Sequence, residues 1–331
     1  MTATRVLVLG GTEFVGRAFV DEALARGHDV TVLNRGTRAP SAGVTGLVGD
    51  RTRSTGLDAL GAGEWDIVVD TWSWAPRAVT DAAARLSGRA GKYVYVSSRS
   101  VYDEPVALAD ESAAVVDGAA DDTGFDDYAR AKRGGELGTL AGFGDRALLL
   151  RAGLVLGPHE NIGRLPWWLS RIARGGDVVA PGPAEAGIQY IDARDLAGFG
   201  LDTAATGAVN VVSPPDTTTM RDLLQACVTA TATGSGARLR WFTPEQLVAA
   251  GAEPWIGLPV WLPPGADAEG MHRGDVSKAV AAGLAIRPLG ETVADTWAWL
   301  TSIGGVAPQR PDRPVVGLPE STERALLDGP F

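Results

Sequence analysis

Residues 6–16 read VLVLGGTEFVG, and this stretch decides the fold. Its apolar start predicts a buried β-strand over Val6–Leu9, and a helical pattern then continues to about Ala25. Between the two, Gly10 can form a tight turn and Gly16 lets the helix approach the strand. The unpaired N–H groups and positive dipole at the start of such a helix suit a pyrophosphate. The alternative is a glycine-rich turn that binds no ligand.

Short β-branched runs alternate with helical patterns through the first half of the chain, which is typical of βαβ units. Strands buried on both faces of a parallel sheet are nearly continuous apolar runs, and VLVL, VTVL, IVV, YVYV and ALLL are such runs. We therefore predict an α/β fold with a doubly wound parallel sheet of Rossmann type. Its expected strands are Val6–Leu9, Val30–Leu33, Thr45–Val48, Ile67–Asp70, Tyr93–Ser97 and Ala147–Arg151.

The second half of the chain is richer in proline, tryptophan and glycine, as in GPHENIGRLPWW and PWIGLPVWLPPG. A stretch typical of a return to the sheet, IQYIDARDLAGFGLD followed by AVNVV, interrupts it. We therefore expect a smaller, interleaved α+β lobe that binds substrate. The predicted boundaries are 1–156 with 187–212 for the dinucleotide-binding domain, 157–186 and 213–305 for the substrate lobe, and 306–331 for a C-terminal linker and short helix capped by Ser321.

The composition is that of a folded, acidic protein. Apolar residues make up 45% and charged residues 21% of the 331 residues, which excludes a disordered chain. The formal net charge of −10 disfavours nucleic acid and anionic membranes as partners. The first residues do not have the pattern of a secretory leader, so we expect no secretion, and the apolar runs are too short to span a bilayer. We expect a cytoplasmic protein with a small-molecule substrate, and a homodimer is the candidate assembly.

The single cysteine and the few histidines do not indicate a disulfide or a metal. Cys227 lies in the helical pattern MRDLLQACVTA, where it should pack as a small hydrophobe. His28, His159 and His272 are not spaced as metal ligands, so we expect no metal.

The residues at the end of the second predicted strand indicate whether NAD or NADP binds. That strand ends in Asn34 and Arg35, where an NAD-specific protein usually has an acid on the ribose hydroxyl. A guanidinium there suits a 2′-phosphate, so the sequence has a slight preference for NADP over NAD. Asp50 is placed either to accept from the adenine amino group or to cap the next helix. The expected cofactor-binding residues are Gly10, Thr12, Glu13, Phe14, Val15, Gly16, Asn34, Arg35, Asp50, Arg51, Thr71 and Lys132.

Two further charged residues, Glu13 and Arg38, lie near the predicted dinucleotide site. Glu13 stands where a middle glycine would normally let the backbone approach the phosphates, so its side chain must turn outward. Arg38, on the same loop as Arg35, is expected to be a solvated side chain.

The pentapeptide YARAK places Tyr128 and Lys132 on one face of a predicted helix, one turn apart. The preceding strand ends in Ser97-Ser98, where side chains project from the carboxyl edge of the sheet. A phenol, with an ordinary pKa of about 10, becomes a usable base when an ammonium and a nicotinamide cation stabilise its phenolate. Tyr128 would then exchange a proton with a substrate oxygen, Lys132 would hold the nicotinamide ribose, and Ser98 would polarise the substrate carbonyl. The alternative is a surface helix with a solvated lysine.

Together these residues resemble the short-chain dehydrogenase/reductase superfamily in its extended form, over nearly the whole chain. The matching stretches are VLVLGGTEFVG, YVYVSSRSVY, YARAK, LLRAGLVLGP, QYIDARDLA and KAVAAGLAIRPLGETVADTWAWL. More narrowly, GGTEFVGRAF with GHDVTVLNRG resembles the atypical, epimerase/dehydratase-like branch with a GGTxFxG motif, in which Glu13 is ordinary. The resemblance implies that Ser98, four residues before Tyr102, is the catalytic hydroxyl rather than Ser97.

Two departures from the family pattern bear on the reaction. Extended enzymes that dehydrate nucleotide sugars carry an Asp-Glu pair after this serine, and this chain has Arg99-Ser100. Sugar epimerases usually read RxxNxxGP, and here RAGLVLGP puts Leu154 in place of the asparagine. The resemblance therefore disfavours a dehydratase and a nucleotide-sugar substrate.

The tryptophans suggest a flat or largely apolar substrate, although each taken singly is more often a core residue. The expected substrate residues are Trp72, Trp74, Arg99, Ser100, His159, Trp168 and Gln189. The first hypothesis is an NAD(P)-dependent oxidoreductase that moves a hydride between nicotinamide and a carbonyl, alcohol or imine of a small aromatic or apolar metabolite. The alternatives are an epimerase or isomerase with retained NAD, and a non-catalytic dinucleotide-binding regulator.

Overall fold

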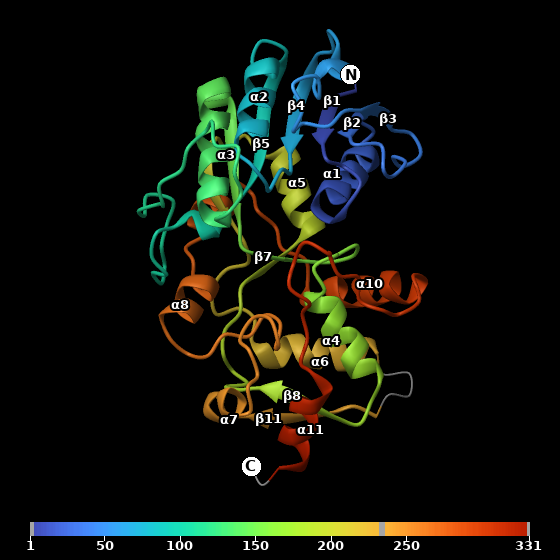
Figure 1. Ribbon diagram of the computed structural model, residues 1–331, viewed down its shortest axis with the longest axis vertical. Helices are drawn as coiled ribbons and strands as arrows, with labels where there is room; N and C mark the ends of the chain where they lie inside the picture. Colours follow the sequence, from blue (N-terminus) through green and yellow to red (C-terminus); the bar gives the residue numbers. More distant parts are fainter. Residues whose placement is uncertain (1–2, 232–235, 330–331) are drawn as a thin grey trace.

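A seven-stranded parallel sheet forms the upper half of the computed structural model, which describes residues 3–231 and 236–329 (Figure 1). The strand order is β10-β6-β5-β4-β1-β2-β3, and every neighbouring pair is parallel. The strands are β1 (Arg5–Leu9), β2 (Asp29–Asn34), β3 (Thr45–Val48), β4 (Trp65–Asp70), β5 (Ala90–Ser98), β6 (Ala147–Ala152) and β10 (Gly207–Val211). This arrangement confirms the predicted Rossmann-type sheet, in which the strand order reverses between β1 and β4.

Helices cover both faces of this sheet. α1 (Phe14–Ala25) packs with α5 (Ala193–Asp202) on one face, and α2 (Arg77–Leu86) packs with α3 (Tyr128–Phe143) on the other. Because side chains alternate along a strand, Val6 and Val8 join the core under α1 and α5, whereas Leu7 and Leu9 join the core under α2 and α3. α1 ends at Ala25, which confirms the helix expected to about that residue.

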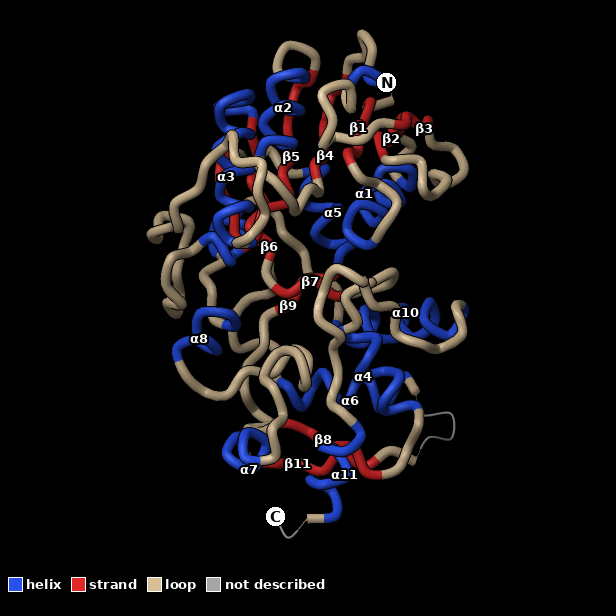
Figure 2. The backbone as a smooth tube through the Cα atoms, viewed as in Figure 1, coloured by secondary structure: helices blue, strands red, loops and turns tan. Residues whose placement is uncertain are grey.

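A further hydrophobic core, separate from the two that flank the sheet, lies at the other end of the molecule, among the elements drawn below the sheet in Figure 2. Its elements include a small parallel pair, β8 (Asp177–Pro181) with β11 (Arg238–Phe242). The helices around it are α4 (Arg164–Ala173), α6 (Met220–Ala230), α7 (Pro244–Ala249), α8 (Ala266–His272), α10 (Leu289–Ser302) and α11 (Glu320–Asp328). α11 begins after Pro319, so the expectation of Ser321 as its cap is wrong, and Ser321 lies within the first turn.

The chain passes between the two halves several times. β7 (Leu154–Leu156) pairs with β9 (Tyr190–Asp192) between them, and β9 leads directly into α5 of the sheet-bearing half. The short α9 (Ser277–Ala281) also packs on β10. Short 3₁₀ turns lie at Asp58–Leu60, Arg99–Val101 and Gly144–Arg146. Within the described residues, no helix is both long and apolar enough to cross a membrane.

Candidate active site

A cavity of about 590 Å³ opens at the carboxyl ends of the central strands. Its walls include the turn after β1, the ends of β4, β5 and β6, the start of α3, and segments of the second half of the chain. In open α/β sheets, ligands bind at this edge where the strand order reverses. The cavity thus brings together residues far apart in the sequence.

The glycine turn after β1 has the geometry of a pyrophosphate cradle. Gly10 has a φ of +104°, and a Cβ on Gly16 would lie 2.4 Å from the Gly10 carbonyl oxygen, so a side chain is excluded from Gly16. No acidic side chain lies in the first turn of α1, and no side chain caps its first N–H groups. These free donors and the helix dipole fit a dinucleotide phosphate.

Glu13 adapts to this cradle through two contacts. Its carboxylate accepts from Asn161 Nδ2 at 2.9 Å and forms a 3.2 Å ion pair with Arg38, so its charge is compensated beside the turn. Arg38 is exposed, as expected, and it also forms this ion pair. The next residue, Phe14, has a φ of +33°, a backbone conformation that bulky residues rarely adopt and that is often found at functional turns.

Of the expected cofactor residues, seven line the cavity: Gly10, Glu13, Phe14, Val15, Gly16, Thr71 and Lys132. Thr12 lies in the same turn, but its side chain is not part of the wall. Asn34 uses its Oδ1 to accept the Gly36 N–H, and Arg35 is exposed on the adjacent loop. Asp50 accepts from the N–H and hydroxyl of Thr52, as a turn-capping residue does.

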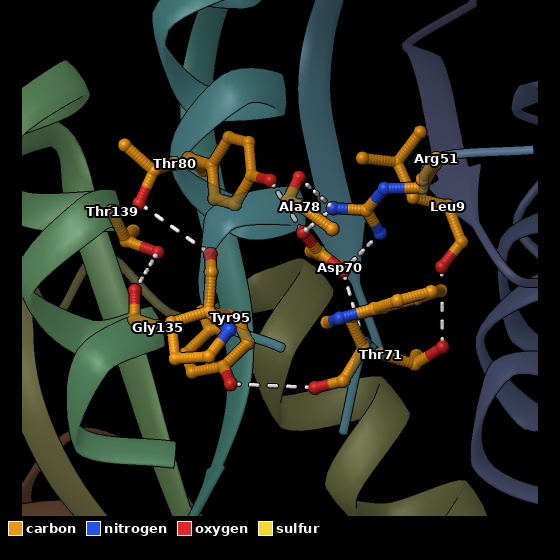
Figure 3. A network of polar contacts seen from close by, with 12 residues as sticks. Leu9, Arg51, Asp70, Thr71, Ala78, Thr80, Tyr95, Gly135 and Thr139 are labelled. Carbon is orange, nitrogen blue, oxygen red and sulfur yellow. Dashed lines mark hydrogen bonds and ion pairs between the residues drawn. The ribbon is translucent and has the colours of Figure 1, made fainter. Parts of the chain in front are cut away.

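Arg51 does not reach the cavity, which corrects its assignment as a cofactor contact. Its buried guanidinium donates to both carboxylate oxygens of Asp70, at 2.7 and 2.6 Å, and to the Ala78 carbonyl (Figure 3). Asp70 also accepts from the Tyr93 hydroxyl, and the guanidinium lies 5.1 Å from the Trp72 ring centroid. A buried bidentate pair of this kind ties β4 to the loop after β3, so Arg51 is structural.

Ser98, Tyr128 and Lys132 all line the cavity. Ser98 ends β5, and its hydroxyl bonds to Ser100 at 3.1 Å, whereas the Ser97 hydroxyl donates to the buried Glu136. Tyr128 and Lys132 occupy the first turns of α3, which begins after the cap residue Asp127. Ser98, rather than Ser97, therefore offers a hydroxyl beside the tyrosine.

Lys132 is held in place by the backbone. Its buried ammonium donates to the carbonyls of Val96 and Trp72, at 2.6 and 2.7 Å. An ammonium has three donors, so one remains for a ligand in the cavity. Its Nζ lies 6.0 Å from the Tyr128 ring centroid and 4.8 Å from that of Tyr95.

The electrostatics of the tyrosine differ from the sequence-based expectation. Burial raises the pKa of Tyr128, and the nearby Ser98 hydroxyl and the guanidinium groups of Arg313 and Arg164 oppose this rise. Burial also lowers the pKa of Lys132 to about 7. The cations that lower the pKa of the phenol are therefore these two arginines, and Lys132, whose ammonium the sequence analysis expected to do so, is not among them.

Several expected substrate residues lie outside the cavity. Trp168 is fully buried and donates to the Pro259 carbonyl, and Gln189 is fully buried among backbone partners, so both assignments are corrected to structural roles. Trp72 donates its indole N–H to Ala75, Trp74 packs on Phe125, and His159 packs on Trp299. Arg99 and Ser100 do line the cavity.

The second half of the chain contributes cavity residues that are not among the expected substrate residues. Arg164, Trp255, Arg310 and Arg313 all line the cavity. Arg310 and Arg313 fall in the segment expected to be a linker. No local pattern marks them, because they come together only through the fold.

The fold and the cavity define a Rossmann-type protein of the short-chain dehydrogenase/reductase superfamily, in its extended form. The chain belongs to the NAD dependent epimerase/dehydratase family, whose sequence profile matches residues 6–206. No curated protein matches it significantly.

Solved structures with the same fold cover nearly the whole chain. A putative epimerase from Burkholderia cenocepacia J2315 is 20% identical, with a TM-score of 0.65 over 91% of this chain and 97% of that one. The Bordetella bronchiseptica enzyme WbmH, solved with NAD⁺, is 18% identical, with a TM-score of 0.66 over 92% and 100%. The Thermus thermophilus UDP-glucose 4-epimerase, solved with NAD, is 19% identical, with a TM-score of 0.63 over 90% and 99%.

Proposed function

We propose that this protein is an NAD(P)-dependent oxidoreductase that interconverts a carbonyl and an alcohol, or an imine and an amine, in a small molecule. The observation that carries the proposal is the joint presence of Ser98, Tyr128 and Lys132 in the wall of one cavity, next to the glycine cradle. Membership of a family described as NAD dependent agrees with it. In this proposal, residues 1–156 and 187–212 hold the dinucleotide, and 157–186 and 213–305 bind the substrate.

Each catalytic side chain has a defined task. The bound nicotinamide supplies the hydride acceptor or donor. Ser98 donates to the substrate oxygen and orients it, and Tyr128 passes a proton to or from that same oxygen. The free donor of Lys132 holds the nicotinamide ribose, while Gly10, Gly16 and the start of α1 bind the pyrophosphate. Arg313 and Arg164 favour the charged form of Tyr128.

We propose that the dinucleotide is NAD or NADP, with Arg35 as the residue that would favour NADP. The solved neighbours WbmH and the Thermus epimerase contain NAD, which supports the unphosphorylated cofactor. Arg35 is exposed on the loop after β2, where it is free to meet a 2′-phosphate.

The test is the substitution Tyr128→Phe, assayed by nicotinamide absorbance with a panel of aldehydes, ketones and their alcohols. We expect turnover to fall at least about a hundredfold, because the phenol is the proton carrier, while NAD and NADP still stabilise the protein against heat. Comparing the two thermal shifts shows which cofactor binds more tightly. Undiminished turnover in the variant would refute the assignment.

A second candidate is an epimerase that retains NAD and returns the hydride to its substrate. The family and the neighbouring solved epimerases favour this candidate. Leu154, which lines the cavity where sugar epimerases usually have asparagine, disfavours a nucleotide-sugar substrate for it. Nicotinamide that survives purification, with no net absorbance change during turnover, would select the epimerase.

A further inference from the structure

The charged side chains around the cavity are almost all cationic. In a protein with a formal net charge of −10, the described wall holds a single acid, Glu13, which is already bound to Arg38 and Asn161. The cations in the wall are Arg99, Lys132, Arg164, Arg310 and Arg313. Such a concentration of one sign raises the local concentration of anions.

Three of these cations already have partners. Lys132 donates to two carbonyls, and Arg99 donates to the Gln189 side chain and to the carbonyls of Gly270 and Met271. Arg310 forms a bidentate pair with Asp312. These contacts fix the three groups and compensate for much of their desolvation.

Arg164 and Arg313 differ from the other three. Neither guanidinium forms an ion pair with any carboxylate of residues 3–231 and 236–329. The acid whose charge acts on Arg164 is the buried Glu160, and its two oxygens accept the backbone N–H groups of Arg164 and Leu165. Glu160 is therefore bonded to the first N–H groups of α4, and the Arg164 guanidinium remains available to a ligand.

Both free guanidiniums lie beside the catalytic tyrosine. The Arg313 Cζ is 5.5 Å from the Tyr128 ring centroid, and the Arg164 Cζ is 5.2 Å from the Trp255 ring centroid. Their charges both act on Tyr128. They come from distant parts of the chain, one from the first turn of α4 and one from the segment between α10 and α11.

That segment is anchored at both ends. Gln309 exchanges two hydrogen bonds with the backbone of Val316, and the Gly317 N–H donates to the Ile256 carbonyl. Arg310 also lies 5.4 Å from the Trp74 ring centroid, which connects the segment to the loop after β4. The contacts of Gln309 and Arg310 before Arg313, and of Gly317 after it, thus hold Arg313 at the cavity.

We propose that the substrate carries an oxyanion, a carboxylate or a phosphate, which Arg164 and Arg313 bind together within a few atoms of the carbon oxidised or reduced at Tyr128. This inference rests on the proposed function. A guanidinium fork matches either anion with two parallel hydrogen bonds. Ile162, Ile256 and Trp255 supply an apolar wall next to the pair, so the rest of the substrate is small and apolar.

The experiment measures binding rather than turnover, by calorimetry on the full chain with NAD present. The probes are benzoate, phenyl phosphate and the neutral isostere benzamide. We expect at least one anion to bind about tenfold or more tightly than benzamide, and the tighter anion assigns the substrate as a carboxylate or a phosphate. Loss of a charge-assisted contact in Arg313→Gln or Arg164→Gln should weaken that anion about ten- to a hundredfold.

The matched control is Arg310→Gln, which removes a charge from the same segment but one already paired with Asp312. Its effect on anion binding should stay within about threefold. An unchanged thermal shift with NAD verifies that each variant is folded. Equal binding of benzamide and the anions, or full anion binding by both Arg313→Gln and Arg164→Gln, would overturn the inference. Tyr128→Phe separates the two proposals, because it should abolish turnover and leave anion binding intact.

Discussion

At the scale of single residues, the buried charges of this protein separate into structural and functional groups according to their partners. Arg51 and Asp70 satisfy each other, and Arg151 with Glu136 does the same beneath β5. Burying a charge is costly unless it is paired and hydrogen-bonded. Side chains paired in this way are structural. Among the described residues, Arg164 and Arg313 are the cavity guanidiniums that meet neither an acid nor a carbonyl, so they are the candidates for ligand binding.

Arg51→Ala should therefore destabilise the fold strongly without touching the cavity. The substitution leaves Asp70 buried with only the Tyr93 hydroxyl and the Trp72 N–H as donors. Removing one partner of a buried pair costs about 3–5 kcal/mol. Urea unfolding measures the loss, and Arg53→Ala is the control, because its exposed pair with Asp50 should contribute less than about 1 kcal/mol. A loss from Arg51→Ala no larger than that of the control would contradict this account.

At the scale of elements, the turn between β1 and α1 links the sheet to the cofactor site. The close approach of Gly16 to the Gly10 carbonyl lets the helix start directly above the strand end, with its N–H groups at the cavity. The motif VLVLGGTEFVG predicted this turn correctly, because it depends on local backbone geometry. The bond of Glu13 to Asn161 was not foreseeable, because Asn161 is distant in the sequence.

Gly16→Ala should damage this turn selectively. A Cβ placed 2.4 Å from the Gly10 oxygen must push the helix from the strand, which typically costs about 1–3 kcal/mol. We expect the thermal shift by NAD to disappear in this variant. Gly88→Ala is the control, because the added Cβ would meet no atom within 4 Å, and its NAD response should match that of the wild type. A normal NAD response in Gly16→Ala would argue against the cradle.

At the scale of the whole molecule, two buried titratable groups, Glu160 and His272, change the stability of the fold in opposite directions as pH rises. Burial raises the pKa of Glu160 from 4.5 to about 7, and burial lowers the pKa of His272 from 6.5 to about 4. A raised carboxyl pKa means that the folded state binds the extra proton, so this contribution to stability is lost as pH rises toward 7. The His272 contribution has the opposite sign, so the two offset each other between about pH 4.5 and 6.5.

Glu160→Gln should reveal how much Glu160 contributes to the pH dependence of stability. The amide still accepts backbone N–H bonds at the start of α4 but cannot ionise, so the stability difference, wild type minus variant, should fall as pH rises from about 4.5 to 7. The fall is of the order of 3 kcal/mol for a shift of this size. Urea unfolding at several pH values measures it. A difference that stays constant across this range would show that Glu160 is ionised throughout.

The sequence by itself determined the Rossmann sheet, the glycine turn, and the placement of Tyr128 and Lys132 one helical turn apart. These features follow from local rules: apolar runs make buried strands, glycines permit tight turns, and residues four apart share a helix face. The same rules place Ser97 and Ser98 at a strand end beside the crevice, and the choice of Ser98 between them rested on the family resemblance.

The tertiary structure alone decided which side chains surround the reaction centre. It buried Trp168 and Gln189, paired Arg51 with Asp70, and brought Arg164, Trp255 and Arg313 to the cavity. The physical reason is that the cavity forms between segments far apart in the sequence. Which side chains line it therefore depends on how the two halves of the molecule pack, and not on any local pattern. Whether an arginine is a structural partner or is free to bind an anion depends on the acid that the fold places beside it.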